Sequence, residues 1–343
     1  MKQSFSTIDS GGAVYASAAP GACTGAREPL RIALAGYGVV GQALAERLRA
    51  DPQFEISAIL VRRPDLDREV APPVRVTDDI DAFLASPADI LVDVLSCAET
   101  GARLCTELLP RGVHVASASK RVVSSRHALL HAAARRGGAK LLHAASVGGG
   151  APVLETVAVA AARGQVARVS GILNGTVNFI LTQLAAGRNF DEALAEARRA
   201  GFAEENPSED LSGADAAAKV KLIAAQAFGL DPALLSVDVE PLDASAAERI
   251  RASGERWIQL ARVERHGDFL RASVRLCRRS AVPALPHVDG EWSCALIELA
   301  SGETVQCSGP GAGGYPTADS ILGDLRRIAA SVVHAEQPAV LAC

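Results

Sequence analysis

Short apolar runs alternate with amphipathic segments along the first 145 residues. The apolar runs predict strands at 30–35, 54–61, 90–95, 113–116 and 140–145. Between them, helical spacing predicts helices from the turn after residue 35 through Leu48, and at 99–109 and 124–136. Strands that alternate with helices in this way are typical of an α/β protein with a doubly wound parallel sheet.

The pattern changes after the glycines at 148–150. Helices are expected at 152–163, 176–186, 190–200 and 214–228, then strands at 257–263, 269–277, 293–299 and 305–308, then a last helix at 317–330. Elements that do not alternate strictly favour an α+β second domain. We therefore expect a flexible leader at 1–29, a first domain at 30–147 that 308–331 completes, a second domain at 148–307, and a tail at 332–343.

Composition narrows the class of protein. The net charge of −4 argues against a nucleic-acid partner, and no run of about eighteen apolar residues predicts a membrane span. The seven cysteines form no C-x-x-C pair, so they predict neither a zinc site nor a disulfide framework. Reduced cysteines suit the cytoplasm.

The first predicted strand runs into Gly36-Tyr37-Gly38-Val39-Val40-Gly41, which opens the first helix. Gly36 allows the tight turn, Gly38 lets a pyrophosphate approach the backbone, and Gly41 lets helix and strand pack closely. The helix N-terminus, with Val39 and Val40, then faces the anion. The motif in this context predicts a Rossmann-type dinucleotide site, although an ordinary strand–helix turn can also contain three glycines.

The end of the second strand decides which dinucleotide fits. A carboxylate there would bind the ribose hydroxyl of NAD, but this chain has Arg62 and Arg63, whose guanidinium groups suit the 2′-phosphate of NADP. NADP is therefore favoured over NAD. Asp65 and Asp67 follow closely, so the arginines could instead be solvated surface.

Several segments carry a resemblance to homoserine dehydrogenase. They are Ser119-Lys120, S-V-G-G-G-A-P at 146–152, G-I-L-N-G-T at 171–176, A-E-E-N-P at 203–207, D-x-x-G-x-D-A-x-x-K at 210–219, and G-P-G-A-G-G at 309–314. The chain resembles the short form without a C-terminal regulatory domain. The resemblance implies NAD(P)-dependent interconversion of L-homoserine and L-aspartate 4-semialdehyde in threonine and methionine biosynthesis, by a homodimer.

Oxidation of an alcohol by hydride transfer needs a group that takes the hydroxyl proton. Lys219 is the first candidate, because it follows Asp215 by four residues and shares its helical face. An exposed Asp–Lys helix pair is the alternative. The resemblance implies that Lys120, which follows a predicted strand at the carboxyl edge of the sheet, is the second lysine, near nicotinamide and substrate; otherwise it is a surface lysine.

The substrate's ammonium needs carboxylates, and its carboxylate needs donors. By resemblance, Glu204 and Asp215 bind the substrate and Asp210 lies beside the reacting lysine. Gly175 and Thr176 begin a predicted helix, where backbone N–H groups and a hydroxyl could receive a carboxylate, or simply form a turn and a cap. The resemblance extends the cofactor site to three further residues, Ser96, Cys97 and Gly311.

Four positions depart from the family pattern: Ser119, Ala144, Phe202 and Asn206. Ala144 stands where many members have a glutamate that helps to hold a monovalent cation. Carbonyls of Val147, Gly149 and Ala151 would match the rest of that site, but carbonyls alone bind such ions weakly, so we do not expect a firm Na⁺ or K⁺ site.

Two other functions compete with the one that the resemblance implies. The departures leave room for a related small hydroxy-amino acid as substrate. A catalytically silent nucleotide-binding regulator is the rival from another class, although it would have no use for the lysines and carboxylates. An aspartate semialdehyde dehydrogenase would need a nucleophilic cysteine, and no motif surrounds Cys97 or Cys105.

Overall fold

The computed structural model describes the chain except for residues 1–5, 9–27, 67, 69, 71–72 and 337–343. The described residues form two compact units. One unit, here the split unit, joins the residues between Val14 and Ala145 to those from Gly314 onward. The other, the inserted unit, contains Ser146–Gly313 and the short strand at residues 6–8.

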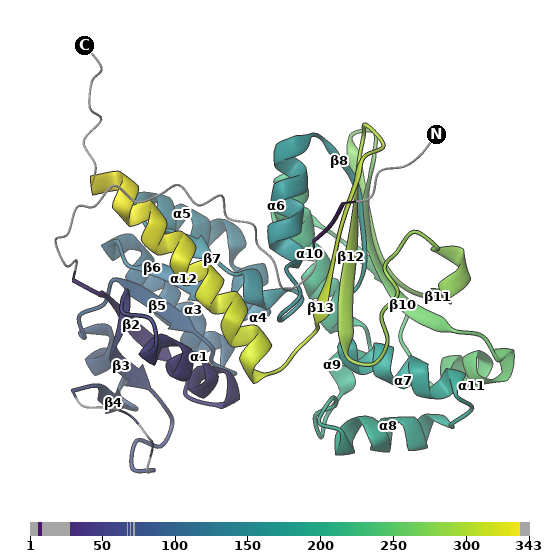
Figure 1. Ribbon diagram of the computed structural model, residues 1–343, viewed down its shortest axis with the longest axis horizontal. Helices are drawn as coiled ribbons and strands as arrows, with labels where there is room; N and C mark the ends of the chain where they lie inside the picture. The colour runs from purple at the N-terminus through teal and green to yellow at the C-terminus, as the bar shows by residue number, and fades with distance from the viewer. Residues whose placement is uncertain (1–5, 9–27, 67, 69, 71–72, 337–343) are drawn as a thin grey trace. The chain divides into compact units, whose positions relative to one another are not determined.

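A six-stranded parallel sheet forms the centre of the split unit (Figure 1). Its strand order is β4-β3-β2-β5-β6-β7, which confirms the predicted doubly wound sheet. The strands are β2 (Leu30–Ala35), β3 (Phe54–Leu60), β4 (Arg75–Thr77), β5 (Ile90–Asp93), β6 (His114–Ser117) and β7 (Leu141–Leu142).

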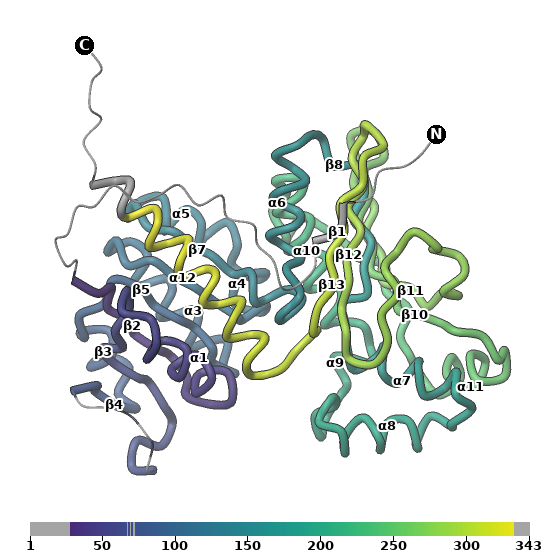
Figure 2. The backbone as a smooth tube through the Cα atoms, viewed as in Figure 1, coloured from purple at the N-terminus to yellow at the C-terminus, as the bar shows by residue number. Residues whose placement is uncertain are grey.

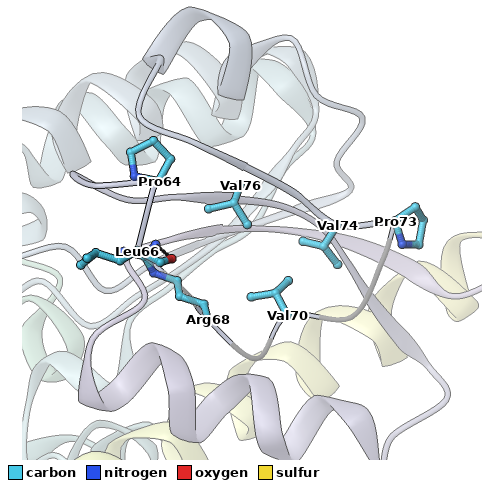
Figure 3. A pocket seen from close by; sticks show the side chains of 7 residues that line it. All are labelled: Pro64, Leu66, Arg68, Val70, Pro73, Val74 and Val76. Atoms are coloured by element: carbon cyan, nitrogen blue, oxygen red, sulfur yellow. Dashed lines mark hydrogen bonds between the residues drawn. The ribbon is translucent and has the colours of Figure 1, made fainter.

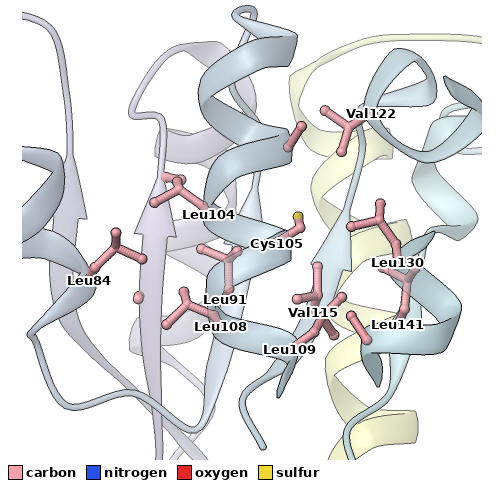
Figure 4. Packing of buried hydrophobic residues seen from close by; sticks show 14 of the residues in the cluster. Leu84, Leu91, Leu104, Cys105, Leu108, Leu109, Val115, Val122, Leu130 and Leu141 are labelled. Carbon is pink, nitrogen blue, oxygen red and sulfur yellow. The ribbon is translucent and has the colours of Figure 1, made fainter. Parts of the chain in front are cut away.

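Helices cover both faces of this sheet. One face packs against α1 (Val39–Arg49) and α12 (Gly314–Glu336). The other packs against α2 (Ile80–Leu84), α3 (Ala98–Leu108), α4 (Lys120–Ser125) and α5 (His127–Gly137). Figure 4 shows this second core, where Leu104, Cys105 and Leu108 of α3 lie over Leu91 and Val115. Such small aliphatic side chains suit a sheet buried on both faces.

Two predicted elements of the split unit differ in the structure. The helix expected at 124–136 is two helices, because Ser119 caps a helix that starts at Lys120 and Arg126 (φ −131°, ψ 24°) interrupts the helical backbone. The strand expected at 140–145 is only two residues long, since the chain turns into a short 3-10 helix at Ala144.

The chain leaves the split unit after Ala145 and returns as α12, drawn yellow in Figure 2. The sequence prediction starts the returning segment at residue 308, but β13 (Thr304–Pro310) belongs to the other sheet and the division follows Gly313. Ile321, Leu325 and Ile328 of α12 are fully buried in the core shared with α1. The helix continues into the expected tail as far as Glu336.

A seven-stranded mixed sheet forms the inserted unit, in the order β1-β13-β12-β8-β10-β11-β9. Its remaining strands are β1 (Ser6–Ile8), β8 (Val166–Ile172), β9 (Val237–Val239), β10 (Trp257–His266), β11 (Phe269–Arg278) and β12 (Trp292–Leu299). Thus three residues of the expected leader pair with β13, while the rest of 1–27 lies outside the described residues.

Six helices accompany this sheet in the described chain: α6 (Val153–Arg163), α7 (Gly175–Ala185), α8 (Phe190–Arg199), α9 (Ser208–Leu211), α10 (Ala214–Phe228) and α11 (Ala244–Ser253). Helices α7, α8 and α11 share one apolar core. Across both units, short 3-10 helices occupy Leu109–Arg111, Ala144–Ser146, Pro232–Leu234 and Arg279–Ala281.

The helices and the mixed sheet of the inserted unit confirm the predicted α+β second domain.

Candidate active site

The glycine turn lies between β2 and α1, as predicted from the motif. Gly36 has a φ of 106°, and a Cβ there would lie 2.9 Å from the Val94 carbonyl oxygen. A Cβ on Gly41 would lie 2.3 Å from the Gly36 oxygen, whereas a Cβ on Gly38 would meet no atom within 4 Å. Packing within the chain therefore explains why glycine is needed at positions 36 and 41. At Gly38 the chain leaves open space.

The adjoining N-terminus of α1 suits an anion. Gly38 is its N-cap residue and supplies no capping side chain, and the first turn contains no acidic residue. The first backbone N–H groups of a helix lack intrahelical partners and carry partial positive charge. Val39 is 76% exposed at this helix start, so the turn is accessible.

A buried carboxylate organises the adjacent edge of the sheet. Asp93, at the end of β5, is inaccessible to solvent and accepts hydrogen bonds from the Ser117 hydroxyl (2.8 Å) and the Leu95 N–H (3.2 Å). Ser117 Oγ in turn accepts from the Ser119 N–H at 3.1 Å. Burial raises the pKa of Asp93. These bonds fix the loops before Cys97 and Lys120. The sequence does not indicate this role, because Asp93 stands within an apolar run and its partners come from other segments.

The predicted cofactor residues at this edge lie at two helix starts. Cys97 is exposed at the N-cap of α3, and the Thr100 hydroxyl, which lies 3.4 Å from its sulfur, lowers the pKa of the thiol. Ser96 is exposed beside it. Lys120 is half-buried at the first position of α4, where Ser119 Oγ accepts from the Val122 N–H. Ser119 is thus a capping residue, a role that asparagine fills equally well.

Arg62 and Arg63 are exposed just beyond β3. Nearby, a cavity of about 410 Å³ lies between this loop and β4 (Figure 3), and Pro64, Leu66, Arg68, Val70, Pro73, Val74 and Val76 line it. The Arg68 guanidinium donates to the Leu66 carbonyl at 2.8 Å. Arg68 belongs to none of the sequence motifs. Asp65 is exposed, and Asp67 lies outside the described residues.

In the inserted unit, Lys219 and Asp215 form a buried ion pair one turn apart on α10. Their Nζ and Oδ2 atoms are 2.8 Å apart, and the side chains are 12% and 6% exposed. Lys219 Nζ also donates to the Leu173 carbonyl oxygen at 2.6 Å. The pair is therefore not the exposed helix pair that the sequence left open.

Asn174 connects this pair to a second carboxylate. Its Nδ2 donates to Asp210 Oδ1 (2.7 Å) and to Asp215 Oδ2 (2.9 Å), while its Oδ1 accepts from the Val177 N–H (2.8 Å) and caps α7. We call Asn174, Asp210, Asp215 and Lys219 the lysine cluster. With both carboxylates ionised, the cluster carries one net negative charge. From the sequence, Asn174 is only one residue of the G-I-L-N-G-T segment, because its partners lie 36 and 41 residues away.

The predicted substrate residues around α7 differ in their surroundings. A Cβ on Gly175 would lie 2.6 Å from the Glu291 oxygen, so packing requires this glycine. Thr176 Oγ1 donates to the Phe202 carbonyl at 2.5 Å, so the hydroxyl proton of Thr176 already has an acceptor within the chain. The Phe202 ring packs on Phe179, with centroids 4.9 Å apart. Glu204 is exposed, and Asn206 Oδ1 accepts from Ser208.

The glycine loop at 147–151 lies in the inserted unit. Val147 and Ala151 are buried, and a Cβ on Gly149 (φ 60°) would lie 2.6 Å from the Gly311 oxygen. Gly311, predicted to bind cofactor, thus packs against Gly149 within this unit. Ala144 is buried in the split unit, where its N–H donates to Asp324 Oδ2 at 2.9 Å. Its methyl group offers a cation no ligand atom, so we still do not expect a firm Na⁺ or K⁺ site.

Within the described part of the chain, every helix is too short or too polar to cross a membrane. Two family models match: "Homoserine dehydrogenase, NAD binding domain" over residues 36–144 and "Homoserine dehydrogenase" over 152–325.

Curated relatives include the homoserine dehydrogenases of Mycobacterium tuberculosis and Bacillus subtilis. The first is 31% identical over 322 residues, which span 88% of this chain and 72% of the relative. The second is 30% identical over 313 residues, which span 86% of this chain and 72% of the relative. A solved homoserine dehydrogenase from Thiobacillus denitrificans has a TM-score of 0.81 at 26% identity, covering 90% of this chain and 76% of that one. A hyperthermophilic archaeal homoserine dehydrogenase in complex with NADPH shares the fold, with a TM-score of 0.75 at 22% identity and coverage of 88% and 98%.

Proposed function

The chain belongs to the homoserine dehydrogenase family and interconverts L-homoserine and L-aspartate 4-semialdehyde with NAD(P), and we propose that Lys219 and Lys120 move the proton in this reaction. The family match does not favour the alternatives of a silent nucleotide-binding protein or a related substrate. The observation that carries the proposal is the buried Lys219–Asp215 pair.

A bound nicotinamide supplies hydride acceptance and donation, and the residues of this chain supply the rest. When the carbonyl is reduced, the Lys219 ammonium donates a proton to the carbonyl oxygen and becomes a neutral amine; when the alcohol is oxidised, the neutral amine takes the hydroxyl proton and becomes the ammonium again. A lysine ammonium has three donors, and the bonds to Leu173 and Asp215 use two of them. Those bonds hold Nζ in one place, which favours reaction of a correctly placed substrate.

The charge of the lysine cluster suits an amino-acid substrate. Its net negative charge attracts the substrate's ammonium, for which we propose Glu204, Asp210 and Asp215 as partners. The start of α7 offers backbone N–H groups at Gly175 and Thr176, and its first turn contains no acidic residue. We assign the substrate's carboxylate to that helix end.

For the cofactor we propose NADP. No carboxylate ends β3, and two exposed arginines follow it. The archaeal neighbour was solved with NADPH, which agrees with this choice. The proposed cofactor site comprises the glycine turn, the two arginines, Ser96, Cys97 and Lys120. We also propose, from the resemblance alone, a cytoplasmic homodimer that serves threonine and methionine biosynthesis.

Substitution of Lys219 tests the proton-transfer role. Lys219→Ala should lower kcat by at least about two orders of magnitude, the contribution of a general acid–base group. Turnover is followed by nicotinamide absorbance with aspartate semialdehyde. Lys221→Ala is the matched control, because it removes a half-buried lysine from the same helix outside the cluster. Wild-type-like turnover by Lys219→Ala, with Lys221→Ala also unchanged, removes Lys219 from the mechanism.

A further inference from the structure

Three histidines of the split unit lie together, and none of them has a role in the proposed reaction. His127 and His131 are one turn apart on α5, and His143 follows β7. One possible ligand atom from each lies within 4.8 Å of the other two. The ring centroids of His127 and His131 are 4.2 Å apart, and each is 6.4 Å from that of His143. We call these three residues the histidine cluster.

We propose that the histidine cluster binds one Zn²⁺ ion through three imidazole nitrogens, with a fourth position left for water. Imidazole nitrogen is a preferred Zn²⁺ ligand, and three protein ligands plus water form a common tetrahedral set. Histidines four residues apart on a helix project from the same face, so they can share one ion. The turn of chain after β7 supplies the third ligand.

The geometry requires a modest contraction. Zn–N bonds of about 2.0–2.1 Å in a tetrahedral site place the nitrogens about 3.4 Å apart. The observed separations reach at most 4.8 Å, so side-chain rotations would close the remaining gap. His127 and His131 are partly exposed, which gives an ion and its water a route from solvent, while His143 is only 8% exposed.

The protonation of His131 and His143 favours a cation. Burial, with the neighbouring histidines, lowers the pKa of His131 to about 4 and that of His143 to about 3. Both imidazoles are therefore neutral at neutral pH, and neutral imidazole is the form that binds metal. The buried Nε2 of His131 has no hydrogen-bond partner among the described residues. A buried nitrogen in that state is costly, and an ion would satisfy it.

Two arginines face the cluster and oppose a cation. Arg135 contributes to the lowered pKa of His131, and Arg327 of α12 to that of His143. Arg327 forms an ion pair with buried Asp324, which offsets its charge. Arg135 is exposed, so solvent screens it. The arginines weaken the site without removing any of its ligands.

Zn²⁺ titration of the full chain tests this proposal. After chelator treatment and dialysis, isothermal titration calorimetry with ZnCl₂ should show one saturable equivalent. At a free Zn²⁺ concentration of 100 times Kd, the midpoint of thermal unfolding should rise by about 5–10 °C. Co²⁺ should give visible absorption that an equivalent of Zn²⁺ abolishes.

Variants show whether the histidine cluster holds the ion. His131→Gln and His127→Gln should each lose the saturable equivalent, the thermal shift and the Co²⁺ absorption. His266→Gln should keep all three, because His266 is an exposed histidine in the inserted unit. Circular dichroism of the metal-free variants checks that they fold. Absence of a saturable equivalent in the wild type, or its persistence in folded His131→Gln, overturns the proposal.

Discussion

The side chain of Asn174 both caps a helix and holds two carboxylates of the lysine cluster. Its carbonyl oxygen caps α7, and its NH₂ group holds Asp210 and Asp215 beside Lys219. Sequence reasoning could place Asp215 next to Lys219, because a spacing of four residues is a local helical property. It could not place Asn174 or Asp93, because their partners come from other elements and only the tertiary fold brings them together.

The predicted effect of Arg62 depends on a single phosphate of the cofactor. Arg62→Ala should raise the Kd for NADP about tenfold and leave that for NAD nearly unchanged, because only NADP has a 2′-phosphate for a guanidinium to bind. Fluorescence titration with both cofactors measures the two constants. Arg136→Ala, which removes an exposed arginine of α5, is the control. Equal weakening of both cofactors would refute the assignment.

The cysteines of the chain differ in exposure and in pKa. Cys97 is exposed with a lowered pKa, whereas burial raises the pKa of Cys294 to about 12 and that of Cys307 to about 11. At neutral pH, iodoacetamide should therefore modify Cys97 well before either buried thiol. Because its pKa is lowered, Cys97 should also keep reacting at a lower pH than a free cysteine does.

Bound cofactor should change this reactivity selectively. Saturating NADP should slow alkylation of Cys97 at least about tenfold if the residue lines the cofactor site, since only an accessible thiolate reacts. Peptide mass spectrometry measures the rate. Cys277 in β11 is the internal control, and its rate should not change. A Cys97 rate that is indifferent to NADP would place this thiol outside the site.

The glycine turn between β2 and α1 meets two separate requirements, close packing within the chain and space for the cofactor. Gly36 and Gly41 are needed by the chain itself, and Gly38 is not. The motif predicted all three in advance because their spacing follows from local strand–turn–helix geometry. By contrast, the central strand β8 was not predicted. Its partners β10 and β12 come later in the chain, and its burial does not alternate as in a sheet with one exposed face.

Alanine substitutions separate the two requirements of the turn. Gly38→Ala should leave the melting temperature nearly unchanged, since its Cβ meets no atom, but should raise the Kd for NADP at least about tenfold by obstructing the pyrophosphate. Gly41→Ala should unfold at a lower temperature, because its Cβ would lie 2.3 Å from the Gly36 oxygen. Differential scanning calorimetry and cofactor titration give both quantities. Unaltered NADP affinity in Gly38→Ala would argue against this position as the phosphate contact.

Helix α12 returns the C-terminal part of the chain to the unit that contains β2–β7. It seals the sheet face that it shares with α1, and Arg47–Asp319 and Arg326–Asp51 ion pairs tie it there. The alternation of strands and helices predicted the parallel sheet, because that pattern reflects local burial. It could not predict the pairing of residues 6–8 with β13, since three residues at the chain start carry no such pattern.

Removal of α12 should destabilise the split unit alone. Exposure of the sites filled by Ile321, Leu322, Leu325 and Ile328 forfeits about 6–12 kcal/mol of burial, which is comparable to the whole stability of a domain. A chain that ends at Gly313 should therefore lose NADP binding, and limited proteolysis should cut it between residues 28 and 145. A chain that ends at Glu336 serves as the control. NADP binding of normal affinity without α12 would contradict this expectation.

The position of α12 near the end of the chain determines when the split unit can finish folding on the ribosome. When Ala145 has been made, 198 residues of the 343 remain, so at 5–20 residues per second the helix that completes the first sheet arrives about 10–40 s later. The inserted unit emerges in full during that interval, while the apolar side of α1 stays uncovered. Nascent chains therefore expose the apolar surface of α1 and its sheet for a defined time. In a polysome, α12 of a neighbouring copy could bind to that surface.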